Sequence, residues 1–148
     1  MDLLVLFGRI LYTAVFLVSV PGLFSESAIQ YAAALGVPMT GVLVPLAGVT
    51  ALLGGASILI GYKAKKGAWL LALFLTPVTL MLHRFWDFAD PSMAALQQVH
   101  FMKNLSLLGA ALLIAHFGSG PWSLDNWINR RSRERHGTKM IDLTLKRG

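Results

Sequence analysis

Hydrophobic residues gather into four long blocks along this chain, and short polar segments separate the blocks. The blocks cover roughly residues 3–21, 39–62, 68–86 and 99–118. A bilayer core about 30 Å thick requires roughly 20 mostly apolar residues in a helix, and each block approaches that length. The pattern therefore predicts an all-α fold, an integral membrane four-helix bundle.

The composition agrees with a membrane protein. Hydrophobic residues make up 55% of the 148 residues and charged residues only 14%, with a mean hydropathy of +0.62. Soluble domains carry about 25% charged residues. The chain contains no cysteine, which excludes disulfides, thiolate chemistry, iron–sulfur clusters and covalent c-type haem attachment for this chain acting alone.

The first block has a second interpretation, a cleaved signal peptide. Asp2 stands where a signal peptide carries a basic cluster, and Arg9 interrupts the apolar stretch. No A-x-A-like cleavage site follows the block. We therefore expect a retained membrane helix.

Basic residues are distributed unevenly between the segments that connect the blocks. Lys63, Lys65 and Lys66 lie between the second and third blocks, whereas residues 22–38 contain no Lys or Arg. Further basic residues follow the fourth block: Arg130, Arg131, Arg133, Arg135, Lys139, Lys146 and Arg147. By the positive-inside rule both basic segments are cytoplasmic. Four spans then place both termini in the cytoplasm.

The sequence changes character after Gly118, and we divide the chain into a four-helix domain over residues 1–120 and a basic cytoplasmic tail over residues 121–148. Ser123 or Asp125 could cap a short amphipathic helix in the tail. One side of that helix would carry Leu124, Trp127, Ile128 and Arg131. Its basic charge favours anionic membrane lipid, at about 1 kcal/mol per basic residue near the surface, and nucleic acid is a poor alternative beside a membrane anchor.

Polar side chains form one stripe on each of the third and fourth predicted helices. Thr76, Thr79 and His83 recur at helical spacing, and so do Gln97, His100 and Asn104. The sequence Asp90-Pro91-Ser92 indicates a turn and a helix start, so the two helices should be antiparallel neighbours. We expect both stripes to face inward and to form an outward-opening ligand pocket. The candidate pocket residues are His83, Asp87, Gln97, His100, Lys103 and Asn104.

Two other interpretations of this polar cluster exist. One is interfacial anchoring, because Trp favours the headgroup level and Arg and Lys extend towards water. The other is a Cu(I) or bis-His haem site, from the patterns Met81-x-His83 and His100-x-Met102. Methionine is common in apolar helices, so we predict no metal site.

Arg9 lies inside the first apolar block, where a buried charge requires a partner. Asp125 follows the fourth block and is the acid expected at the same membrane level. We therefore predict a structural ion pair between Arg9 and Asp125. The alternative is that Arg9 extends its side chain to the headgroups without a partner.

Several stretches of the chain resemble the DoxX family of small four-helix bacterial membrane proteins. They are "FGRIL", "LAGVTALLGGASILIGYKAKKGAWLLALFL", "MLHRFW", "QQVHFMKNLSLLGAALLIAHFG" and "GPWSLD", and together they cover roughly residues 7–125. Arg9, His83, Lys103, Asn104 and Asp125 stand at positions compatible with the family pattern. The resemblance implies a relationship to the small subunit of thiosulfate:quinone oxidoreductase and to proteins of membrane-associated oxidative-stress complexes.

The chain departs from that family in two places. Many members have a Glu on the second helix where this chain has Ala51, and a Gly-x-x-Lys pattern where this chain reads "VPGLFSESA". An activity that depends on those residues is therefore in doubt here.

Two function classes follow from these observations. The first is a membrane subunit or partner of a redox system, which binds quinone or another lipophilic ligand while a soluble partner performs the oxidation. The second is a non-catalytic membrane protein that binds lipid or small molecules, or scaffolds a partner. The sequence contains no Gly-rich nucleotide loop and no nucleophile-and-base motif, so nothing in it favours an autonomous enzyme.

The cofactor is undetermined, with quinone as the candidate. The expected partners are membrane lipids, a soluble redox partner and further copies of the chain, without nucleic acid. The expected location is the bacterial inner membrane.

Overall fold

The computed structural model describes residues 2–132, which are almost entirely helical and contain no strand. The elements are α1 (Asp2–Leu23), α2 (Glu26–Ala34), α3 (Thr40–Ile60), α4 (Ala64–Leu82), the short 3-10 helix η1 (Phe85–Asp87) and α5 (Pro91–Phe117). A further helix covers residues 124–132. The predicted tail residues Arg133, Arg135, Lys139, Lys146 and Arg147 lie outside the described residues.

Four of these helices are long and apolar enough to cross a membrane: Leu3–Leu23, Thr40–Ile60, Ala64–Asp87 and Pro91–Phe117. The predicted all-α membrane bundle is therefore confirmed. The fourth span begins at Pro91, earlier than the predicted residue 99. Asp90 is its N-cap, and the Asp90 carboxylate accepts the Ser92 N–H at 3.1 Å. The cap and the proline start the helix before the apolar block begins.

The helix α2 was not predicted, because residues 22–38 were interpreted as a loop. Ser25 is its N-cap, and the Ser25 hydroxyl accepts the Ala28 N–H at 3.2 Å. Glu26 follows in the first turn, where a carboxylate interacts favourably with the helix dipole. These starting signals are present in the sequence, but α2 is only 9 residues long and lacks a membrane-length apolar block.

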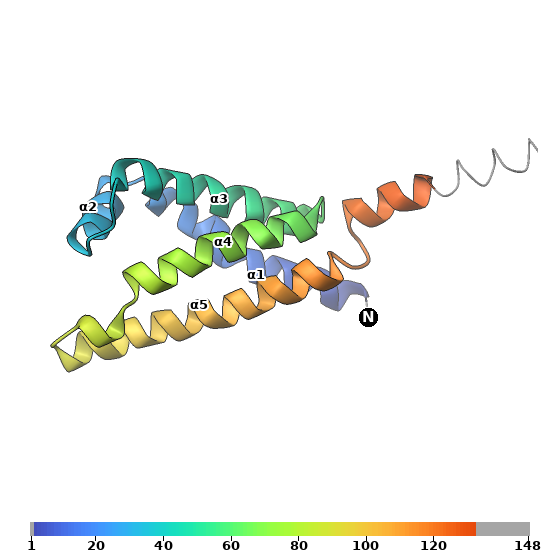
Figure 1. Ribbon diagram of the computed structural model, residues 1–148. Helices are drawn as coiled ribbons and strands as arrows, with labels where there is room; N and C mark the ends of the chain where they lie inside the picture. Colours follow the sequence, from blue (N-terminus) through green and yellow to red (C-terminus); the bar gives the residue numbers. More distant parts are fainter. Residues whose placement is uncertain (1, 133–148) are drawn as a thin grey trace, which may run out of the picture.

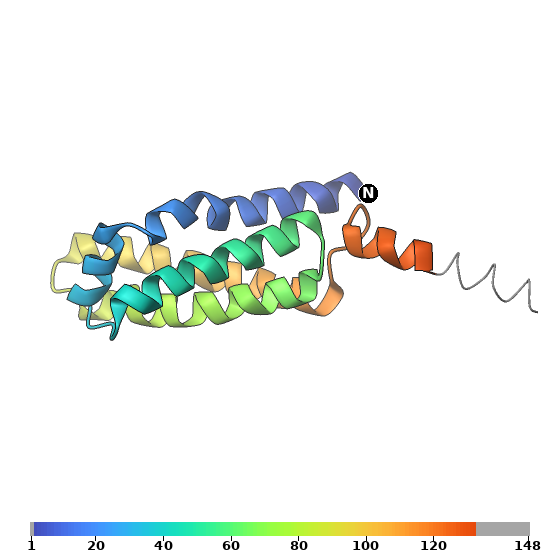
Figure 2. The ribbon, with the colours of Figure 1, turned by 90° about the horizontal axis from the view of Figure 1, so that it is seen from above.

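The long helices form a bundle in which α3 packs between α1 and α4, and α4 packs between α3 and α5. Figures 1 and 2 show α2 at the end of the bundle where α1 ends and α3 begins. The opposite end holds the start of α1, the α3–α4 turn and the helix over residues 124–132 (Figure 2). We call the α2 end the polar-cluster end, because the polar residues predicted to form a pocket lie at that end. We call the opposite end the basic end, because Lys63, Lys65 and Lys66 lie at that end.

The core lies between the helices, and the outer faces of the bundle are apolar. Phe16, Ile58, Leu71 and Leu75 are buried together, with Ala64 and Ala68 among them. Many large hydrophobic side chains elsewhere are exposed. A bundle that is apolar both inside and outside is expected in hydrocarbon.

Small residues recur at four-residue spacing in the sequence, as Ala47, Ala51 and Gly55 on α3 and as Ser106 and Ala110 on α5, which predicts that these faces point into the bundle. Ala51 and Gly55 are buried on α3. Ser106 on α5 was predicted to face inward, yet it is exposed, and its hydroxyl donates to the Met102 carbonyl at 3.0 Å. Asn104 and Ala111 are buried instead. The buried face of α5 is therefore the one that carries Gln97 and Asn104, and not the one that carries Ser106.

Two glycines allow α3 and α4 to approach closely. A Cβ added at Gly54 would lie 2.7 Å from Leu71 Cδ2 and 2.9 Å from the Gly67 carbonyl oxygen. A Cβ added at Gly67 would lie 2.6 Å from Ser57 Cβ. Close backbone approach at small residues is a main source of helix association in lipid.

We expect Gly67→Ala to destabilise the bundle by about 1–3 kcal/mol, because the new methyl group overpacks the α3–α4 contact. Gly109→Ala on α5 is the matched control, since a Cβ there meets nothing within 4 Å. Its only expected effect is a gain in helix propensity of up to about 1 kcal/mol. Unfolding in mixed micelles with increasing dodecyl sulfate measures both. Equal stability of the two variants would contradict the close packing.

Candidate functional site

A chain of hydrogen bonds joins three helices at the polar-cluster end. His83, the C-cap residue of α4, places Nδ1 at 2.8 Å from Gln97 Oε1 on α5. The Gln97 amide donates in turn to the Tyr31 hydroxyl on α2 at 3.3 Å. An amide oxygen only accepts, so the first contact requires a proton on Nδ1 of His83. Gln97 is only 5% exposed, and its burial is compensated by these two bonds.

His100 and Lys103 extend this cluster along α5. The rings of His83 and His100 stack with their centroids 5.2 Å apart and their planes 24° apart. Lys103 Nζ lies 3.5 Å from His100 Nδ1, and the lysine side chain is exposed. The structure therefore brings together four of the six candidate pocket residues: His83, Gln97, His100 and Lys103.

Asn104 lies on the same face of α5, about two turns from Gln97. It is 6% exposed, and its side-chain amide makes no hydrogen bond within residues 2–132. Buried amides ordinarily have a partner. Asn104 therefore retains hydrogen-bonding capacity for a bound molecule or a water.

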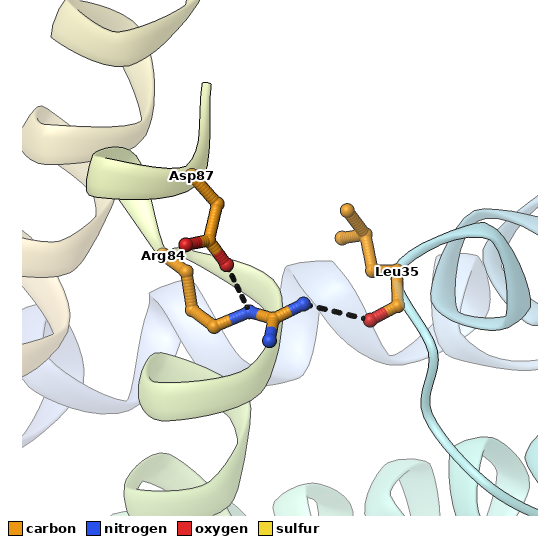
Figure 3. Close-up of polar contacts among 3 residues, drawn as sticks. All are labelled: Leu35, Arg84 and Asp87. Carbon is orange, nitrogen blue, oxygen red and sulfur yellow. Dashed lines mark hydrogen bonds and ion pairs between the residues drawn. The ribbon is translucent and has the colours of Figure 1, made fainter. Parts of the chain in front are cut away.

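Asp87 does not join the pocket, contrary to the prediction. Its carboxylate pairs with Arg84 Nε at 3.1 Å (Figure 3). Arg84 Nη2 also donates to the Leu35 carbonyl oxygen at 2.9 Å. Leu35 is the C-cap residue of α2, where carbonyl groups lack helical partners and a cation is favoured. Arg84 and Asp87 thus attach α2 to the α4–α5 connection.

Sequence reasoning missed the roles of Tyr31 and Arg84. Tyr31 lies on α2 and Arg84 binds the C-terminal end of α2, and this helix was itself not predicted. The signal that could have identified them is the Ser25-Glu26 helix start, which places Tyr31 and Leu35 near one end of a short helix.

An apolar cavity of about 330 Å³ lies between α3 and α4 and reaches beneath α2. Its lining includes Leu23, Ala32, Val44, Ala47, Thr50, Phe74, Val78 and Leu82. The Thr50 hydroxyl donates to the Leu46 carbonyl at 2.8 Å, so the wall offers almost no free polar group. Consecutive residues link the cavity to the polar cluster, because Ala32 and Leu82 line the cavity while Tyr31 and His83 belong to the cluster.

Three aromatic rings form a separate contact next to the cluster. Phe85, Trp86 and Phe101 meet edge to face, with centroids 5.0–5.8 Å apart. Trp86 is exposed, which is typical of a side chain at the membrane–water interface.

Asp90 lies outside the spans and caps α5. Hydrogen bonds from the Ser92 hydroxyl and backbone N–H hold the pKa of the Asp90 carboxyl below its usual value. A lowered folded pKa means that this contribution to stability is present above the ordinary Asp pKa and is lost as the pH falls through the folded pKa.

The predicted ion pair between Arg9 and Asp125 is wrong: no such pair forms among the described residues. Arg9 is 4% exposed, and its Nη2 donates to the Trp122 carbonyl oxygen at 2.6 Å. Its Nε and Nη1 have no hydrogen-bond partner within residues 2–132. Both residues do lie at the basic end, but they bind backbone groups and not each other.

Asp125 caps α4 instead. The carboxylate accepts the backbone N–H of Lys63 at 2.9 Å and that of Ala64 at 3.3 Å. The N-cap residue of α4 is Lys63, whose side chain cannot accept a hydrogen bond. The amides at the start of α4 therefore attract a carboxylate from the helix over residues 124–132. Asp125 N–H also donates to the Gly61 carbonyl at 2.9 Å.

No group of three or more His, Asp or Glu that could hold a metal ion is found in the described part of the chain. The polar cluster offers a ring N–H, an ammonium and amides, which suit oxygen acceptors of an organic ligand.

Comparison with known proteins defines the family. Residues 3–130 match the SURF4 family. The chain belongs to the SURF4 family. The expected DoxX membership is therefore wrong: its motifs were short, and small-residue helices joined by charged turns recur in membrane bundles for packing reasons. The redox relationship that the resemblance implied loses its basis.

Two bacterial relatives cover most of this SURF4-family chain. It is 29% identical to inner membrane protein YphA of Escherichia coli over 124 residues, 82% of this chain and 88% of the relative. It is 33% identical to inner membrane protein YqjF of the same organism over 132 residues, 88% of this chain and 95% of the relative. With the four apolar spans, these relatives support a multi-pass inner membrane protein.

A eukaryotic relative matches a shorter part. The chain is 35% identical to the ER-derived vesicles protein ERV29 of Saccharomyces cerevisiae over 66 residues, 45% of this chain and 21% of the yeast protein. No solved structure matches the chain.

We expect Asp125→Ala to destabilise the protein by about 1 kcal/mol, because α4 loses its side-chain cap. Asp125→Asn should cost much less, since an amide oxygen also caps a helix well. Detergent unfolding measures both, with the exposed Asn129→Ala as the control. An ion pair with Arg9 would instead make the Asn variant as unstable as the Ala variant.

Proposed function

We propose that this SURF4-family protein binds an amphiphilic, lipophilic ligand at the polar-cluster end of its bundle. The apolar part of the ligand occupies the cavity beneath α2, and its polar head contacts the cluster of His83, Gln97, His100 and Lys103. The observation that supports this proposal most is the apolar cavity of about 330 Å³ next to that cluster.

The cavity suits a hydrocarbon or ring-bearing body. Its volume lies at the lower end of the range of about 300–1,000 Å³ that is usual for small-molecule sites. Its wall is apolar, which suits the apolar part of a ligand. The membrane supplies such molecules at high concentration, so the site needs no high affinity to be filled.

The cluster suits a polar head with oxygen acceptors. Lys103 presents an ammonium, Asn104 has an amide without a partner among residues 2–132, and His100 adds a second imidazole. Opposing polar and apolar sides are typical of small-molecule sites, where a few polar groups fix the orientation. A quinone, with carbonyl oxygens on an apolar ring and tail, is one member of this ligand class.

The helix α2 contributes to the wall of the cavity. Ala32 is 1% exposed and lines it, while the Gln97–Tyr31 and Arg84–Leu35 hydrogen bonds hold α2 against α4 and α5. A ligand that enters from the polar-cluster end would have to pass this short helix. The proposal therefore describes a binding protein, and any redox step would be performed by a soluble partner.

Binding of a short-chain quinone analogue to the purified protein, followed by tryptophan fluorescence, tests the proposal. We expect saturable binding that Ala47→Phe weakens at least tenfold, because the new ring fills the cavity. His83→Leu should weaken binding about tenfold through the lost hydrogen-bonding group.

Ala14→Phe is the matched control, because Ala14 is exposed on α1 and does not line the cavity. It should bind as the wild type does. Absent binding, or binding that is indifferent to both test variants, would contradict the proposed site. Interfacial anchoring would then explain the polar residues better.

The orientation, the domain division after residue 120 and the partners remain proposals. The basic end, with its three lysines and the helix over residues 124–132, is proposed to face the cytoplasm by the positive-inside rule. Trp122 and Asp125, at the start of the proposed tail, form hydrogen bonds with the bundle. Association with a soluble protein or a second copy is retained as an expectation.

The orientation is testable because the sequence has no cysteine. Ser27→Cys on α2 and Asn129→Cys in the helix over residues 124–132 each introduce one exposed thiol. These two helices lie at opposite ends of the bundle (Figure 2). In intact cells a membrane-impermeant maleimide should label Ser27→Cys only, and Asn129→Cys should react after permeabilisation. Labelling of both positions from the same side would rule out the proposed topology.

A further inference from the structure

A crevice of about 610 Å³ opens at the basic end of the bundle. One wall is the α3–α4 turn with Lys63, Lys65 and Lys66, and the other is formed by residues 118–129. The proposed ligand site lies at the opposite end of the bundle, so this crevice has no role in that function. It lies where the membrane helices end, which is the level of the lipid headgroups.

The crevice carries positive charge that the protein leaves largely uncompensated. Asp125 is the acidic residue in its lining, and both carboxylate oxygens already accept backbone N–H groups of α4. Lys65 donates to the His116 carbonyl at 2.7 Å, while Lys63 lies 5.1 Å from the centre of the Tyr62 ring. Lys66 is exposed. Lys63 and Lys66 therefore have donors available for an anion.

Arg9 adds a further positive charge behind the crevice. A Cβ at Gly61 would collide with Arg9 Nη1 and with Ser123, and Ser123 lines the crevice. The guanidinium forms no ion pair within the described residues. A buried cation without a counter-ion is costly at low dielectric, and an anion nearby reduces that cost.

An apolar groove continues from the crevice. Ser123 lines both, and the groove also contains Ile60, Trp122, Leu124 and Trp127. Both tryptophans are exposed, and Arg131 lies 4.1 Å above the Trp127 ring. Exposed Trp beside basic residues at the end of a span is typical of the headgroup level.

We propose that this crevice binds the phosphoryl group of an anionic phospholipid. Lys63 and Lys66 contact the phosphoryl oxygens, and the glycerol and upper acyl chains lie in the groove of Trp122 and Trp127. Free phosphate matches only the basic half of this surface. A phospholipid matches both halves, because a charged phosphoryl group and apolar chains occur in one molecule.

Native mass spectrometry of the full chain in non-ionic detergent, titrated with phosphatidylglycerol, tests the proposal. Wild type should bind one phosphatidylglycerol more tightly than phosphatidylcholine of the same chain length, by about tenfold. Lys63→Gln with Lys66→Gln should remove that preference, because each basic residue contributes to the attraction. Lys63→Arg with Lys66→Arg keeps the charge and should keep the preference.

Two further measurements separate the alternatives. Inorganic phosphate should not displace phosphatidylglycerol at equal concentration, and Trp127→Ala should weaken both lipids. Lys66→Gln alone, a change at an exposed side chain, should still reduce the preference if the double variant does not fold. The proposal is overturned if the Gln variants retain the full preference, or if inorganic phosphate competes equally.

Discussion

Polar backbone groups at the ends of apolar helices must find partners, and the arrangement of the charged residues follows from this requirement. Asp125 accepts from the first amides of α4, Arg84 donates to the C-cap carbonyl of α2, and Lys65 donates to a carbonyl in the last turn of α5. Each side chain reaches a helix other than its own. The charged residues therefore connect the helices at both ends, while close contact at Gly54 and Gly67 joins α3 and α4 within the membrane.

This requirement also explains why Arg9 and Asp125 do not pair. A carboxylate at a helix N-terminus gains two charge-assisted hydrogen bonds and a favourable interaction with the helix dipole. Arg9 binds the Trp122 carbonyl and leaves two nitrogen atoms without partners in the described residues. The uncompensated guanidinium makes the basic end more attractive to anions, which supports the inferred phospholipid site.

The two ends of the bundle therefore have different chemistry. The polar-cluster end combines imidazole, amide and ammonium groups with an apolar cavity, and α2 contributes to both. The basic end combines lysines with exposed tryptophans. An amphiphile with a weakly polar head suits the first, and an anionic lipid suits the second. Membership of the SURF4 family is compatible with both, because the two bacterial relatives are named inner membrane proteins and their names specify no ligand.

The sequence by itself determined the four spans and the antiparallel turn at Asp90-Pro91, because block length and a local cap depend only on neighbouring residues. The stripe of Gln97, His100 and Asn104 was also predictable, since helical spacing defines a face. Tertiary structure decided the partners. Asp87 pairs with Arg84, Asp125 caps α4, and Tyr31 accepts a hydrogen bond from Gln97. Tyr31 lies on α2, which is too short to be recognised from hydrophobic periodicity. Which donor meets which acceptor depends on distances between helices, and no local pattern encodes those distances.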